Sequence, residues 1–112
     1  MAIAERKDFL KQVEQLGEYE TVAASQTAQA LGATGVRGDY LSHIIIVPES
    51  LSPGDVAIKD GADGAITVFS GGASSLLTKH SWTLAIGLRS RTGGWQITTG
   101  AAVHVLAAGN FS

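Results

Sequence analysis

Apolar and polar residues alternate with a period of two along much of the chain after residue 40. In the stretch 81–90 the even positions up to 88 are large and apolar, namely Trp82, Leu84, Ile86 and Leu88, whereas the odd positions are small or polar. Such alternation predicts a strand with one face buried. The stretch 40–47 contains an unbroken apolar run at 44–47, which predicts a central strand or one buried on both faces. Pro48 should end it, because proline cannot donate a ladder hydrogen bond.

The same pattern predicts further strands. Residues 56–59 and 65–69 alternate on either side of Asp60–Gly64, whose Asp and Gly content is typical of a hairpin turn. Two more strands, at 95–99 and 103–107, follow glycine turns, so the last three strands are expected to form a meander. Residues 21–31 are alanine-rich, as in a helix, but the interleaved Thr and Ser and the glycines after them favour a strand.

Six or seven short strands with glycine-rich turns predict a mainly β domain over residues 21–112, built as an antiparallel β-sandwich or jelly-roll. The alternating positions predict the core of that domain. Its expected members are Ile44, Ile46, Trp82, Leu84, Ile86, Leu88, Ile97, Val103 and Val105.

Residues 1–20 form a different kind of segment, which we interpret as an N-terminal helix or arm. Within 4–16, Phe9, Val13 and Leu16 are spaced i, i+4, i+7, and Gly17 is a plausible stop. A helix this short with so narrow an apolar stripe is marginal alone. It therefore needs a surface, either its own domain or a neighbouring molecule, and the three apolar residues are the candidate partner-binding set.

Composition narrows the function. The 112 residues suit one domain, and with no cysteine there is neither a disulfide nor a thiolate metal site. A net charge of −2 without a basic stripe predicts no nucleic-acid binding, and no apolar run approaches a membrane span. Eight of the eighteen charged residues fall within the first twenty. The charge-poor remainder suggests a domain whose faces are covered by neighbours.

Candidate metal and phosphate sites are weak. The three histidines, His43, His80 and His104, lie far apart in sequence without ligand spacing, so we expect surface or interface residues. The Asp and Gly residues of 60–64 resemble a calcium loop only faintly, because the alternating oxygen ligands and the distal Glu are missing. Residues 71–75 are glycine-rich, but no lysine follows in phosphate-loop spacing.

Other motifs also carry little chemistry. The tripeptide Arg37–Gly38–Asp39 occurs in some cell-adhesion ligands, but three residues match by chance often, and the context is a glycine-rich lead into a strand. Trp82 and Trp95 fall at the apolar positions of their alternating strands and are expected in the core. Recognisable nucleophile or paired-carboxylate motifs are absent from the sequence. We therefore predict a non-enzymatic protein with no cofactor and no metal.

Several stretches carry a resemblance to a known class of protein. They are 38–41, 44–48, 52–54, 58–61, 65–72, 94–101 and 108–111. Over about residues 21–112 the chain resembles small β-rich structural proteins of tailed bacteriophages. The resemblance implies a virion component made in the host cytoplasm, and a capsid decoration (cement) protein of the phage head suits the size best. Such proteins are oligomeric, often trimers, which implies a homo-oligomer bound to the major capsid protein or other virion subunits.

Three alternatives remain open. A phage tail or fibre component that binds a host surface would present exposed aromatic residues. A free carbohydrate- or ligand-binding sandwich would have a defined concave pocket. An enzyme would need a buried cluster of polar residues.

Overall fold

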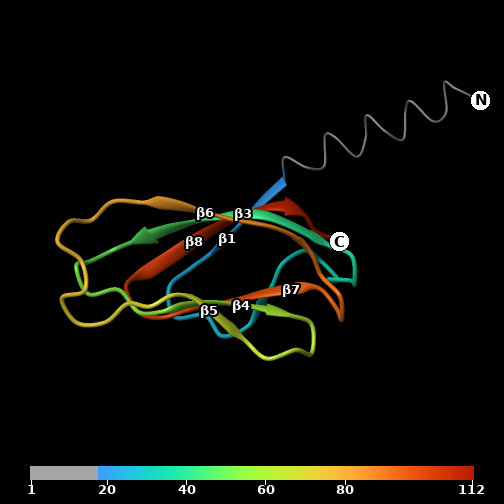
Figure 1. The fold of residues 1–112 in the computed structure, drawn as a ribbon, viewed down its shortest axis with the longest axis horizontal. Helices are drawn as coiled ribbons and strands as arrows, with labels where there is room; N and C mark the ends of the chain where they lie inside the picture. Colours follow the sequence, from blue (N-terminus) through green and yellow to red (C-terminus); the bar gives the residue numbers. More distant parts are fainter. Residues whose placement is uncertain (1–17) are drawn as a thin grey trace, which may run out of the picture.

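The computed structural model describes residues 18–112, so the predicted helix at 4–16 and its Phe9, Val13 and Leu16 lie outside the described residues. Residues 18–112 form eight strands (Figure 1): β1 Glu18–Val22, β2 Gln29–Ala30, β3 Tyr40–Pro48, β4 Val56–Asp60, β5 Ile66–Phe69, β6 Trp82–Arg89, β7 Trp95–Thr99 and β8 Val103–Asn110. The β domain thus begins three residues before its expected start at 21. Within the described range, no helix is long and apolar enough to cross a membrane.

The eight strands form two antiparallel four-stranded sheets that lie face to face (Figure 1). One sheet has the order β1-β8-β3-β6 and the other β2-β7-β4-β5. The first strand pairs with the last, the second with the seventh, the third with the sixth and the fourth with the fifth. This nested hairpin is rolled up so that β8 also pairs with β3 and β7 with β4. That pairing is the topology of an eight-stranded jelly-roll, which confirms the predicted fold class.

The predicted meander of the last three strands is wrong. β6 and β8 lie in the same sheet with β3 between them, whereas β7 belongs to the other sheet. The chain crosses from sheet to sheet at each of the two glycine turns. Period-two alternation identifies the buried face of a strand but does not state which sheet it joins.

The expected single strand at 21–31 is also wrong, because it is two short strands in different sheets joined by a turn. Ser25 and Ala28 have φ angles of 61° and 48°, in the left-handed region that breaks a strand. Buried Thr99 holds this turn: its hydroxyl donates to Ala23 O at 2.6 Å and accepts from Gln26 N at 3.0 Å.

The core lies between the two sheets. Ile44, Ile46, Ile97, Val103 and Val105 are fully buried, as expected, and Trp82, Leu84 and Ile86 are partly buried against them. Leu88, by contrast, is 56% exposed, so its place in the predicted core is wrong. Eight further apolar residues complete the core: Val22, Leu31, Leu41, Val56, Ile58, Trp95, Ala107 and Phe111.

Other predictions about the strands are confirmed. β3 is central, between β8 and β6, and Pro48 is its last residue. The β4–β5 hairpin forms as expected, with Ile58 opposite Ile66. β6 departs from regular geometry near its end: Gly87 has a φ of 64°, and the register with β3 shifts between Leu41 and His43. This irregularity lies just before Leu88 and bends the end of an edge strand.

Candidate interaction surface

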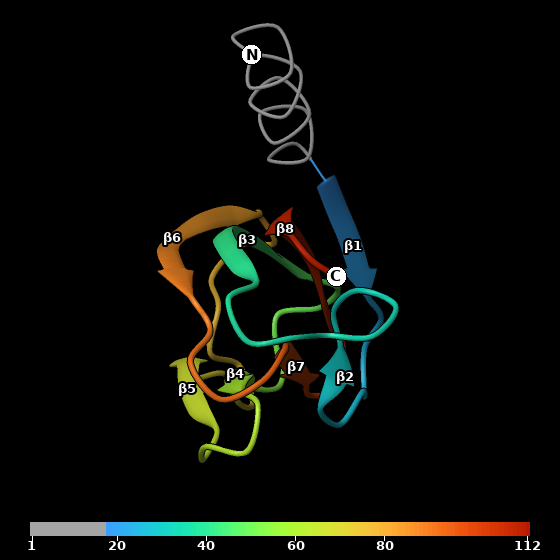
Figure 2. The ribbon, with the colours of Figure 1, turned by 90° about the vertical axis from the view of Figure 1, so that its right-hand side faces the viewer.

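The two long sides of the sandwich differ in how the chain protects them (Figure 2). β1 and β2 are the edge strands on one side, which we call the closed flank. Val22 at the end of β1 and Leu31, the residue after β2, are fully buried. β2 is only two residues long, and β1 carries Glu18 and Glu20. Short and charged edges are the usual defence against unwanted strand pairing.

The opposite side is less protected: β5 is four residues long, and in β6 the protection is confined to the end of the strand, where Gly87 has a positive φ and Arg89 carries a charge. β5 and β6 are the edge strands there, and we call their inward apolar side chains the open flank. Its members are Ile66, Val68, Phe69, Trp82, Leu84, Ile86 and Leu88. None of them carries a charge, and none is fully buried. A long edge with a single charged residue, Arg89 at its end, beside incompletely buried apolar side chains is a surface that another molecule normally covers.

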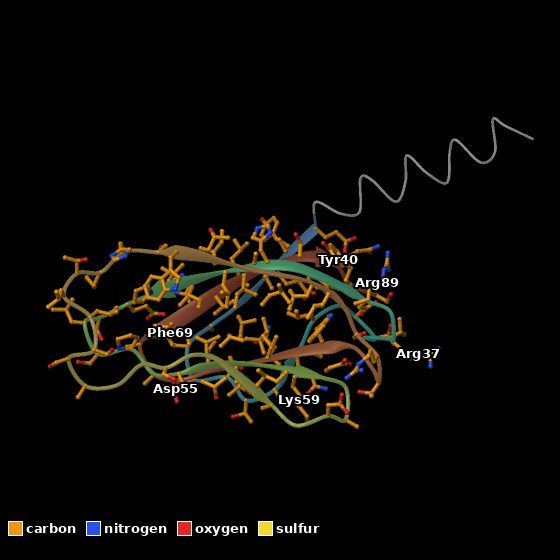
Figure 3. All side chains as sticks on the ribbon, viewed as in Figure 1. Arg37, Tyr40, Asp55, Lys59, Phe69 and Arg89 are labelled. Atoms are coloured by element: carbon orange, nitrogen blue, oxygen red, sulfur yellow. The ribbon has the colours of Figure 1, made fainter. Side chains whose placement is uncertain are left out.

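The open flank is closed at one end and open at the other. At the first end, the rings of Phe69 and Trp82 meet edge to face with centroids 5.1 Å apart, bridging the two sheets; Phe69 lies between them in Figure 3. At the second end, Ile66 and Leu88 are each 56% exposed. A cavity of about 330 Å³, which we call the hollow, opens between them, and buried Trp95 also lines it.

Asp60 holds the rim of this hollow. Its buried carboxylate accepts hydrogen bonds from Arg91 N at 2.8 Å and Thr92 N at 3.1 Å, and Thr92 Oγ1 donates to Asp60 O at 2.6 Å. Burial alone would raise the pKa of Asp60, but the hydrogen bonds from Thr92 and Arg91 and the charge of Arg91 outweigh it, so the pKa lies below its usual 3.8. This carboxylate fixes the 90–92 segment to the end of β4. The 60–64 segment is a hairpin turn, as expected, closed by Asp63 N donating to Asp60 O at 2.9 Å.

A second buried carboxylate, Asp39, has a similar role. It accepts hydrogen bonds from Val36 N at 3.2 Å, Ser112 N at 3.1 Å and Ser112 Oγ at 2.9 Å. The indole Nε1 of Trp95 donates to Asp39 O at 3.0 Å. Asp39 is only 4% exposed, so the Arg37–Gly38–Asp39 tripeptide does not present its aspartate to a receptor.

The histidines lie apart. His104 Nδ1 is 2.9 Å from Glu49 Oε2, His43 Nδ1 is 3.2 Å from Ser42 Oγ, and His80 Nδ1 is 3.0 Å from Thr78 Oγ1. His43 and His104 are on the outward face of the first sheet, as the alternation predicted. Among residues 18–112, no group of three His, Asp or Glu side chains is placed to hold a metal ion.

The glycine-rich stretch 71–75 belongs to the loop between β5 and β6, which is bound to the loop before β4. Gly71 N donates to Asp55 Oδ1 at 2.7 Å, Ser74 N to Ser52 Oγ at 2.7 Å, and Leu76 N to Leu51 O at 3.1 Å. Leu77 projects from this loop and is 97% exposed. Sequence reasoning missed Leu77, because a leucine outside any alternating pattern gives no signal of its exposure.

A second cavity, which is larger and more open than the hollow, lies at the start of β1. Its volume is about 630 Å³, and its lining includes Glu18, Glu20, Gly32 and Phe111. Its carboxylates bind the protein's own backbone. Glu20 accepts a hydrogen bond from Gly32 N, and Glu18 accepts one from Phe111 N at 3.4 Å. Both carboxylates of this cavity are therefore already engaged by the protein's own backbone, which leaves fewer polar groups for a ligand than the size of the cavity suggests.

Comparison with known proteins gives no relative of this chain. No family model, curated protein or solved structure matches it.

Proposed function

We propose that the protein is a non-enzymatic structural component of a virus particle, a capsid decoration (cement) protein that binds and stabilises the assembled head. The observation that carries the proposal is the open flank, where seven apolar side chains of the edge strands β5 and β6 are only partly buried and two of them, Ile66 and Leu88, are 56% exposed. A free domain normally blocks such an edge with charge or with very short strands, whereas a subunit covered by neighbours does not need to. The resemblance to phage structural proteins supplies the kind of assembly.

The jelly-roll topology is compatible with this proposal. Jelly-rolls occur in viral capsid proteins, and also in lectins and cupins, so the fold supports a virion role by analogy and does not select it. A cement protein needs a rigid body and a large contact area. Each contact can be weak, because many copies on one shell supply avidity.

We propose that the protein acts as a homo-oligomer, with a trimer as the first expectation, and that the segment before β1 attaches it to the major capsid protein. The apolar residues Phe9, Val13 and Leu16 are the candidate contacts of that segment. β1 begins at Glu18 and pairs with β8. An attachment segment would therefore join the sandwich directly at a paired edge strand.

The test is a decoration assay with shells that lack the protein. The full chain should co-sediment with shells and raise their resistance to heat or denaturant, and mass spectrometry should find it in purified particles. A Phe9→Ser/Val13→Ser/Leu16→Ser variant should keep its native mass and β-sheet circular dichroism but lose binding. Thr21→Ser, on the exposed face of β1, is the control. A full chain that never associates with heads would remove the capsid assignment.

A ligand-binding sandwich is the second candidate, because the hollow beside Trp95 is the kind of concave pocket that this alternative requires. Apolar Ile66, Leu88 and Trp95 line it together with four charged residues, Asp60, Asp63, Arg89 and Arg91. Titration with simple sugars, monitored by the NMR signals of residues around the hollow, distinguishes the two functions. Saturable shifts confined to the hollow would favour the ligand-binding module. The tail or fibre alternative gains no such support from Trp82 and Trp95, since neither is an exposed aromatic.

A further inference from the structure

We infer that Leu77 of one copy seats in the hollow between β5 and β6 of a second copy. This inference rests on the proposal that the protein self-associates. It does not depend on attachment to a shell. It names the contact by which copies recognise one another.

Leu77 has the properties of an inserting side chain. It is 97% exposed, which leaves a large apolar side chain in water. The loop that carries it is bound to the loop before β4 just ahead of Leu77, where Leu76 N donates to Leu51 O at 3.1 Å. After Leu77, Thr78 Oγ1 lies 3.0 Å from His80 Nδ1, a contact within the loop itself. A leucine presented by a fixed loop loses less conformational freedom on binding than one on a flexible loop.

The hollow has the properties of a receiving site. Ile66 and Leu88, each 56% exposed, lie on its two sides, and its volume of about 330 Å³ leaves room for an apolar side chain. Arg89, which also lines it, is engaged elsewhere: its Nη1 donates to Gly38 O at 3.2 Å, and its guanidinium lies over the Tyr40 ring at 5.8 Å (Figure 3). Filling the hollow with leucine would cover both half-exposed walls, while the long side chain of exposed Arg91 at the rim can keep its guanidinium in water.

The protein's own Leu77 is at the wrong end of the flank to fill its own hollow. Its loop adjoins the Phe69–Trp82 end, whereas the hollow lies at the Ile66–Leu88 end. Six residues of strand from Trp82 to Leu88 separate the ends by about 20 Å. A second copy that lies beside β6 can bring its own Leu77 to the hollow. Two arrangements allow every copy to form this contact. In a two-fold dimer, each Leu77 enters the hollow of the other copy; in a ring, each Leu77 enters the hollow of the next copy, and a ring of three would be the expected trimer.

Charge complementarity supports a second copy as the occupant. Lys79 follows Leu77 by two residues and is exposed, and Asp63 is exposed at the rim of the hollow. An incoming Leu77 would bring Lys79 of the same copy towards Asp63 of the other. The rim also carries exposed Arg91, so opposite charges meet only if Lys79 approaches on the Asp63 side, and the pairing therefore fixes the orientation of the incoming loop.

The first experiment compares Leu77→Ser with wild type by sedimentation equilibrium of the full chain. The dissociation constant of self-association should rise at least about tenfold, which is about 1.4 kcal/mol. Val36→Ser is the matched control, because Val36 is an apolar residue in another loop and is 45% exposed. This substitution should leave the dissociation constant unchanged. Equal association by Leu77→Ser and wild type overturns the inference, as does a wild-type protein that stays monomeric at millimolar concentration.

A charge exchange tests the register of the contact. Asp63→Lys and Lys79→Asp should each weaken self-association several-fold, and the double variant Asp63→Lys/Lys79→Asp should recover most of the loss, because the pair is restored between copies. Additive losses in the double variant would contradict the proposed contact. Decoration of shells is measured separately. Self-association that is independent of Leu77 overturns this inference alone, whereas Leu77-dependent association without shell binding removes only the capsid function.

Discussion

Leu41 and Leu88 are cross-strand neighbours in β3 and β6, yet Leu41 is fully buried whereas Leu88 is 56% exposed. The difference follows from their strands. β3 has a neighbour on each side, but β6 is the edge of its sheet, and the hollow opens beside Leu88. The same apolar alternation therefore gives a core residue in one strand and an interaction surface in the other.

Truncating side chains on these two kinds of strand should have different effects on stability. Ile44→Ala removes a fully buried side chain from central β3 and should lower the free energy of unfolding by about 2–5 kcal/mol. Leu88→Ala should lower it by less than about 1.5 kcal/mol, because much of that side chain is already in water and leaves no closed cavity. Chemical denaturation of dilute protein measures both. Equal losses would mean that the open flank is part of a sealed core.

The two tryptophans should respond differently to replacement by phenylalanine. Trp95→Phe removes the hydrogen bond from Nε1 to Asp39 O and leaves space in a buried site, so it should destabilise the protein by about 1–3 kcal/mol. Trp82→Phe is the matched control. Trp82 is partly exposed and packs through its ring against Phe69, so a smaller loss is expected. Thermal unfolding followed by far-ultraviolet circular dichroism gives the comparison. A larger loss for Trp82→Phe would contradict this assignment.

Some strands of the fold could be predicted from the sequence, and others could not. It identified the strands at 40–48, 56–60, 66–69 and 82–89 closely, because alternation and turn residues are local signals. It placed the last three strands correctly along the chain but failed for their arrangement as a meander and for residues 21–31, since the choice of sheet depends on pairing between distant segments such as β1 with β8.

The candidate surface was less predictable than the fold. Four of the seven open-flank residues, those of β6, were assigned to the core by the alternation, and only the edge position of β6 changes their meaning. Leu77 had no sequence signal at all. The buried carboxylates of Asp39 and Asp60 looked like parts of motifs, but each binds backbone N–H groups across the fold, and such partners cannot be identified from local spacing.

Gly109 should tolerate no side chain. A Cβ at this position of β8 would lie 2.0 Å from Tyr40 O, a backbone atom of neighbouring β3 that has no flexible side chain to move aside. Gly109→Ala should therefore lower the free energy of unfolding by about 3 kcal/mol or more. Gly64→Ala is the control, because nothing lies within 4 Å of a Cβ there and its φ is not positive. Denaturant midpoints of the two variants provide the measurement.

The buried carboxylate of Asp60 predicts a specific dependence of stability on pH. Its pKa is lowered in the folded protein, because hydrogen bonds from Thr92 and Arg91 outweigh the desolvation that would raise it. A lowered pKa means that the ionised Asp60 carboxylate stabilises the folded protein more than the protonated carboxyl group does. The stabilisation is therefore fully present above the unfolded-state value of about 3.9 and is lost as pH falls through the lower folded-state value.

Asp60→Asn should destabilise the protein at neutral pH by about 1–3 kcal/mol, because an amide accepts fewer hydrogen bonds and leaves backbone N–H groups buried without partners. The loss should shrink as pH falls below about 4, because the unfolded wild-type chain then takes up a proton at Asp60 before the folded protein does, and it should be smallest below the lowered folded-state pKa. Urea denaturation from pH 2 to pH 6 tests this, with exposed Asp63→Asn as the control whose difference from wild type should stay small. A difference between Asp60→Asn and wild type that remains constant down to the lowest pH would contradict a lowered pKa for Asp60.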